Sequence, residues 1–130
     1  MSSLVLDTNV LIDLFEGERT LPMEFDCYDR MLIPSIVIGE YRAGLFPTRN
    51  GEMNRRKLES YLANPAVAVV SVSERTAELY ARVYQALRKE GHPIPQNDMW
   101  IAASALEHGA DIVTKDEHFK LVPMLTVVMF

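Results

Sequence analysis

The feature that most constrains this chain is a series of short apolar runs separated by segments of helical periodicity. We predict strands at residues 4–6, 31–33, 67–70, 111–114 and 125–129. In the intervening segments apolar residues recur every three or four positions, which is the helical period. Short apolar strands that alternate with helices indicate an α/β fold, with a mainly parallel sheet that is covered on both faces.

Capping residues mark the ends of the predicted helices. Ser71 and Glu74 stand at capping-box spacing before the longest helix, and Gly91 ends it. Ser35 and Asn97 are the predicted N-caps of two other helices. The predicted helices span 9–15, 35–44, 52–63 and 97–108, the longest helix lies between Ser71 and Gly91, and a weaker helical segment covers 23–29.

The composition is that of an ordinary globular protein, with 48% hydrophobic and 24% charged residues. The 130 residues contain no linker or repeat, so we expect one domain over 1–130. No apolar stretch approaches the roughly 20 residues that span a bilayer. We expect no signal peptide, because the start MSSLVLDTN lacks a basic region. The single cysteine, Cys27, cannot form an internal disulfide, so we predict a small buried side chain in a reducing cytoplasm.

Acidic residues stand at four separate points where a predicted strand or loop meets a helix. Carboxylates at such apolar junctions repel one another, and burying an unpaired one costs several kcal/mol. Sites in open α/β sheets form outside the carboxyl ends of the strands, where two of these residues lie. A divalent cation would compensate the charge if the fold brings them together. The four candidate catalytic and metal-binding residues are Asp7, Glu40, Asp98 and Asp116.

Each acid also has a structural explanation when it is taken alone. Asp7 could cap a helix, Asp98 could sit favourably at a helix N-terminus, and Asp116 could stabilise a turn. Glu40 is different, because Ile36 and Val37 precede it by four and three residues and place it in the apolar stripe of its own helix. The joint pattern favours function over these separate explanations.

Oxygen ligands favour a hard cation, Mg²⁺ or Mn²⁺, over zinc. Four carboxylates could serve one ion, or two ions roughly 3.5–4 Å apart, and the sequence leaves both open. The three histidines lack the spacing of a ligand pair. His118 could contact the substrate, but the favoured interpretation is a turn residue. We expect Trp100 in the core or at a subunit interface.

The formal net charge of −5 argues against bulk attraction to nucleic acid, but it allows a local basic patch. Five basic residues fall between 42 and 57, close to Glu40 in sequence. A solvated helix face is the alternative explanation for such a cluster. The candidate phosphate contacts in this cluster are Arg42, Arg49 and Arg55.

Four segments together resemble the PIN-domain family, and specifically the VapC-type ribonucleases of toxin–antitoxin pairs. They are LVLDTNVLIDL, IPSIVIGEYRAG, NDMWIAASALEHGADIVTKD and the closing DEHF. The resemblance implies a three-layer α/β/α sandwich and an endoribonuclease that depends on Mg²⁺ or Mn²⁺. The family's metal-binding acids carry over onto the four candidates, with Asn9 and Thr114 at supporting polar positions. It also implies a homodimer and a small antitoxin whose C-terminal tail blocks the active site.

Two other functions stay open at this point. One is phosphoryl transfer through an aspartyl-phosphate on Asp7, as in haloacid-dehalogenase-like enzymes. Those enzymes need a second acid two residues later, where this chain has Asn9. The other is a PIN-like module that binds RNA or a protein without cutting, which would have no need of four clustered carboxylates.

Overall fold

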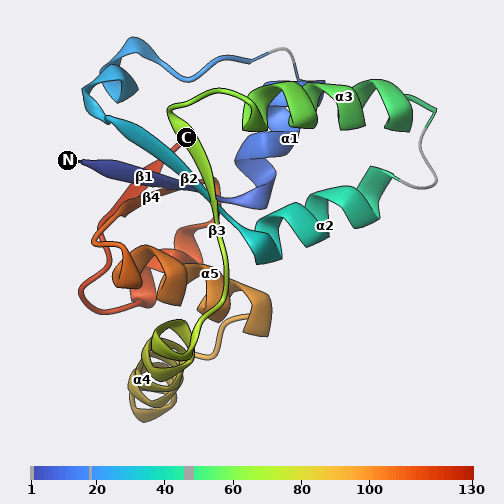
Figure 1. Ribbon diagram of the computed structural model, residues 1–130. Coiled ribbons are helices and arrows are strands. Elements are labelled where there is room, and N and C mark those ends of the chain that lie inside the picture. Colours follow the sequence, from blue (N-terminus) through green and yellow to red (C-terminus); the bar gives the residue numbers. More distant parts are fainter. Residues whose placement is uncertain (1, 18, 46–48) are drawn as a thin grey trace.

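The computed structural model describes residues 2–17, 19–45 and 49–130, and it contains one five-stranded sheet (Figure 1). The strand order is β3-β2-β1-β4-β5, and all four neighbouring pairs are parallel. The predicted parallel sheet is therefore confirmed. The strands are β1 (Ser3–Leu6), β2 (Arg30–Pro34), β3 (Val67–Val70), β4 (Asp111–Thr114) and β5 (Val127–Met129).

Helices cover both faces of the sheet, which confirms the predicted three-layer α/β/α arrangement. In the view of Figure 1, α1 and α3 lie above the sheet, and α4 and α5 lie below it. The helix α2 continues directly from β2 and packs against α1 and α3. The α-helices are α1 (Thr8–Glu16), α2 (Ser35–Leu45), α3 (Gly51–Leu62), α4 (Glu74–Glu90) and α5 (Gln96–Glu107), and short 3₁₀ helices are η1 (Met23–Cys27) and η2 (Glu117–Leu121).

The centre of the core lies between β1 and the helix α5. In β1, Leu4, Val5 and Leu6 are fully buried, because the strand is covered on both faces. The facing side of α5 carries Ala102 and Ala105, also fully buried, and such small side chains let a helix lie close to the sheet. This close packing fixes the start of α5 relative to the end of β1.

The chain order creates a switch point between β1 and β4. From β1 the chain builds outward through β2 and β3, and it then returns to add β4 and β5 on the other side of β1. Leu6 pairs with Val113, and the next backbone amide, that of Asp7, donates to the Val113 carbonyl at 3.1 Å. The segments after these two strands therefore leave the sheet side by side, where ligand sites form in open α/β sheets.

Two predicted helix starts are wrong by one or two residues. The capping box before α4 uses Ser73 and Thr76, not Ser71 and Glu74, because the Ser73 hydroxyl is the one that accepts from the Thr76 amide. The helix α5 already begins at Gln96, since the carbonyl of Pro95 accepts from two amides of the first turn. Asn97 is consequently inside the helix, and its side chain is free for another contact.

Two smaller expectations also change, and a third agrees with the structure. Ser35 is the first residue of α2 and not a residue before it. Cys27 is exposed at the end of η1 and is not a buried apolar side chain. Trp100 is partly buried on α5 and stacks on Tyr80 of α4, with ring centroids 4.0 Å apart, which agrees with a role in packing. None of the helices in the described ranges is both long and apolar enough to cross a membrane.

Candidate functional site

The four acids predicted from the sequence line one hollow of about 560 Å³ at the switch point. Asp7 follows β1 and is the N-cap residue of α1. Glu40 belongs to α2, Asp98 to the first turn of α5, and Asp116 precedes η2. Four segments far apart in sequence thus each contribute one carboxylate to the same hollow.

Asp7 is the most buried of the four, with 3% of its surface exposed. Its Oδ1 accepts from the Thr8 amide at 2.8 Å, and its Oδ2 accepts from the Thr114 hydroxyl at 2.7 Å. Burial raises the pKa of Asp7 from 3.8 to about 6; these two hydrogen bonds oppose the rise, and the charges of Asp98 and Asp116 add to it. The carboxyl group is therefore fixed in position but costly to ionise without a cation.

Asn9 and Thr114 connect the loops that follow β1 and β4. The Asn9 amide nitrogen lies 3.0 Å from the Oδ2 of Asp7 and 3.3 Å from the Oδ2 of Asp116. Its carbonyl oxygen accepts from the backbone amide of Lys115 at 3.1 Å, and the Thr114 hydroxyl accepts from the Asp116 amide at 3.0 Å. Both side chains therefore hold two of the acids at a set separation.

Glu40 is partly buried and held from two sides. The Thr8 hydroxyl donates to its Oε1 at 2.7 Å, and the side-chain amide of Asn97 donates to its Oε2 at 3.3 Å. Thr8 begins α1 and Asn97 lies in the first turn of α5, so this carboxylate joins three helices. The early start of α5 is what places Asn97 within reach of Glu40.

His118, which the sequence favoured as a turn residue over a substrate contact, lies against two of the four acids. Its Nε2 lies 2.6 Å from the Oδ2 of Asp98 and 4.0 Å from the Oδ2 of Asp116. Burial raises the pKa of Asp98, and the contact with His118 opposes that rise. The signal in the sequence is the following residue, Phe119, which is fully buried and pins η2 against the core. A histidine one residue before such an anchor, and two after Asp116, has little freedom to point elsewhere.

The basic side chains of the described part of the chain form their ion pairs with other acids. Lys115 and Arg19 both pair with Asp13, and Arg55 pairs with two glutamates of α3. Within residues 2–17, 19–45 and 49–130, no lysine or arginine forms an ion pair with any of the four site carboxylates. A set of convergent oxygen donors without a lysine or arginine partner in the described residues fits a hard divalent cation.

The sequence and the fold both match known proteins. The family model described as PIN domain matches residues 4–124. The chain belongs to the PIN-domain family.

Similar PIN-domain proteins carry the VapC name. Ribonuclease VapC4 of Mycobacterium tuberculosis is 30% identical over 122 residues, which cover 94% of this chain and 92% of that protein. Ribonuclease VapC1 of Haemophilus influenzae (strain R2866) is 32% identical over 114 residues, covering 85% and 84%. The structure of VapBC-1 from nontypeable Haemophilus influenzae superposes with a TM-score of 0.78 at 28% identity, covering 98% of this chain and 97% of that one.

The three arginines predicted to contact phosphate are not joined to the acids of the PIN domain. Arg55 lies between Glu52 and Glu59 on α3, and both contacts are ion pairs. Arg49 is exposed and Arg42 is partly buried. No hydrogen bond or ion pair links any of the three to the four acids in the described residues. Their contact with a substrate stays a prediction.

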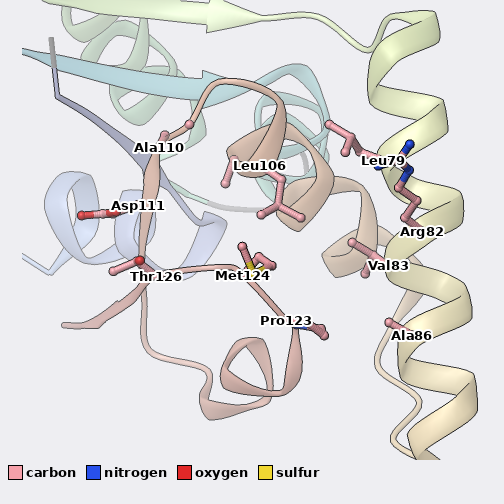
Figure 2. A pocket seen from close by; sticks show the side chains of 12 residues that line it. Leu79, Arg82, Val83, Ala86, Leu106, Ala110, Asp111, Pro123, Met124 and Thr126 are labelled. Carbon is pink, nitrogen blue, oxygen red and sulfur yellow. The ribbon is translucent and has the colours of Figure 1, made fainter.

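A second hollow of the PIN domain, of about 540 Å³, has a different character (Figure 2). Leu79 and Val83 of α4 face Leu106 of α5 across it, and its lining is mainly apolar. Its two charged lining groups are already paired: Arg82 with Glu78, and Asp111 with the hydroxyl of Tyr28 at 2.5 Å. This hollow offers no converging groups for hydrolytic chemistry, so the candidate active site is the one at the four acids.

Proposed function

We propose that this PIN domain is an endoribonuclease that depends on a divalent metal ion and acts as the toxin of a toxin–antitoxin pair. The observation that carries the proposal is the convergence of four carboxylates, without a lysine or arginine partner in the described residues, at the switch point of the sheet. The relatives named ribonucleases support RNA as the substrate.

The acids divide into holding and orienting roles. Asp7, Asp98 and Glu40 would hold Mg²⁺ or Mn²⁺, since the three acids line the same hollow from three different elements. A bound divalent ion lowers the pKa of an attacking water and neutralises charge on phosphate oxygens. Asp116, whose side chain is 51% exposed, would complete the metal shell, bind a second ion or orient the attacking water. In-line attack at phosphorus then leaves 5′-phosphate and 3′-hydroxyl ends.

The two supporting polar residues act through Asp7. Thr114 and Asn9 donate to the same oxygen, Oδ2, and so hold the carboxylate in one orientation at the hollow. An aspartyl-phosphate on Asp7 is disfavoured, because enzymes of that class need a second acid two residues later and this chain has Asn9 there.

We also propose the partners and the location of the protein. The similarity to VapBC-1 supports a small antitoxin partner, and we propose that its C-terminal tail covers the hollow. A homodimer in the cytoplasm, built from one domain over residues 1–130, completes the proposal.

The reaction is tested with the full chain purified away from any bound partner. A mixed pool of structured RNAs is incubated with Mg²⁺, with Mn²⁺, or with EDTA, and the new ends are mapped. We expect cuts with either metal ion, none with EDTA, and 5′-phosphate at each cut. Cleavage that persists in EDTA would contradict a metal-dependent mechanism. RNA binding without cleavage in any condition would favour a binding module.

A further inference from the structure

The imidazole of His118 faces two site carboxylates at once. Its Nε2 lies 2.6 Å from the Oδ2 of Asp98 and 4.0 Å from the Oδ2 of Asp116. One potential ligand atom from each of the three residues lies within 4.8 Å of the other two. Around an octahedral cation with bonds of about 2.1 Å, neighbouring ligand atoms are roughly 3 Å apart and opposite ones roughly 4.2 Å apart. Small side-chain rotations would bring all three onto one ion.

The 3₁₀ helix η2, in which His118 lies, sets the position of the imidazole. His118 lies in η2, next to the fully buried Phe119, and the two rings are 5.1 Å apart between centroids. Within the described ranges, the contact with Asp98 is the one hydrogen bond that the imidazole makes. Its side chain is 30% exposed and faces the acids. The imidazole nitrogen is therefore within reach of a cation that Asp98 also binds.

We propose that His118 is a nitrogen ligand of a divalent cation held together with Asp98 and Asp116. This inference rests on the proposed function and deepens it, because it adds a nitrogen donor to a set of oxygen donors. Imidazole binds first-row transition metals better than it binds Mg²⁺, whereas carboxylates accept both. The site therefore prefers Mn²⁺ to Mg²⁺, and the preference depends on this one side chain.

The test detects the metal–nitrogen bond itself. The full chain, freed of metal with EDTA and dialysed, is loaded with one equivalent of Mn²⁺ and studied by electron spin echo envelope modulation. The wild type should show coupling of the Mn²⁺ electron spin to a ¹⁴N nucleus. His118→Gln keeps a polar side chain but lacks the imidazole and should lose the coupling. The matched control His92→Gln alters an exposed loop histidine and should keep it.

A second readout is metal affinity. By isothermal titration we expect His118→Gln to weaken Mn²⁺ binding by about 10-fold, the lower range for altering a group at a metal site. Mg²⁺ binding should change much less, so that the ratio of the two affinities falls. His92→Gln should leave both unchanged.

Three results would overturn the inference, and only the third would also overturn the proposed function. If Mn²⁺ binds the wild type without ¹⁴N coupling, and Asp98→Asn abolishes that binding, His118 is not a ligand although the acidic site stands. Equal loss of Mn²⁺ and Mg²⁺ affinity in His118→Gln would mean that His118 only positions Asp98. Absence of any Mn²⁺ binding to the wild type would overturn both this inference and the proposed function.

Discussion

The hydroxyl of Thr114 donates a 2.7 Å hydrogen bond to the Oδ2 of Asp7, across 107 positions of sequence. Asp7 directly follows β1, and Thr114, which is fully buried, is the last residue of the neighbouring parallel strand β4. The bond therefore ties the two segments that carry Asp7 and Asp116, and it partly offsets the cost of burying Asp7. Fold and site depend on the same contact.

Removing this hydroxyl should damage both stability and activity. Thr114→Val keeps the shape of the side chain but leaves Asp7 with one donor fewer, and the loss of a buried hydrogen bond to an ionised group costs about 1.5–3 kcal/mol. We expect a corresponding fall in the free energy of unfolding, measured in urea at pH 7, together with weaker RNA cleavage. Thr114→Ser retains the hydroxyl and should lose much less. Equal losses in both variants would show that packing matters here and the hydrogen bond does not.

The raised pKa of Asp7 predicts how the stability of the metal-free protein depends on pH. Folding raises this pKa from 3.8 to about 6, so the folded state holds the proton more tightly than the unfolded state. The contribution of Asp7 to stability is complete below about pH 4 and is lost as the pH rises through 6. A tenfold change in proton affinity corresponds to about 1.4 kcal/mol. Ionising Asp7 in the folded state therefore lowers the free energy of unfolding by on the order of 2–3 kcal/mol.

Asp7→Asn should therefore stabilise the metal-free protein at pH 7 by on the order of 2 kcal/mol while it abolishes RNA cleavage. The neutral amide avoids the cost of burying a charge but cannot hold a cation in the same way. Unfolding in urea at pH 4 and at pH 7 measures the effect, which should nearly vanish at pH 4. A variant that is less stable than the wild type at pH 7 would contradict the raised pKa of Asp7.

Metal ions should stabilise the protein, and more strongly at pH 7.5 than at pH 5. Binding to the folded state alone adds about 2.7 kcal/mol when the free ion is at 100 times its Kd. At pH 5 Asp7 is largely protonated, and burial also raises the pKa of Asp98, so a bound ion must first displace protons. Thermal unfolding with and without Mn²⁺ at the two pH values measures this. A change in Tm that is equal at both would argue against these two acids as ligands.

A polar cluster between α4 and α5 should affect stability alone. The hydroxyl of Thr76, fully buried, donates to Glu107 at 2.5 Å, and Ser73 donates to the same carboxylate at 2.9 Å. Thr76→Val removes one of these donors and should lower the free energy of unfolding by about 1–3 kcal/mol. The rate of RNA cleavage by the folded fraction should not change. A changed rate would mean that this cluster affects the geometry of the hollow that the four acids line.

The strands and the acids could be predicted because each depends on local signals. The strands at 67–70 and 111–114 are observed with the predicted bounds, since short apolar runs flanked by turns allow few alternatives. The carboxylates were recognised by residue type at junctions between elements, and a parallel sheet brings such junctions to one edge. Their roles as metal ligands stay predictions.

What the sequence could not show depends on contacts between distant residues. The partnership of His118 with Asp98 needs the relative placement of η2 and α5, to which the burial of Phe119 and Ala102 in the core contributes. The helix α5 begins earlier than predicted because the Pro95 carbonyl accepts from two backbone amides. Residue preferences alone do not reveal this backbone geometry. The exposure of Cys27 likewise depends on where η1 lies on the surface.

The most direct test of the central claim compares three proteins for RNA cleavage in the same preparation and buffer with Mn²⁺. They are the wild type, Asp98→Asn, and the control Glu117→Gln, whose side chain is 81% exposed and which directly follows Asp116. We predict that the wild type and Glu117→Gln cut at the same positions, and that Asp98→Asn, folded by circular dichroism, does not cut. Equal cleavage by all three would place the reaction outside the four-carboxylate hollow and contradict the account.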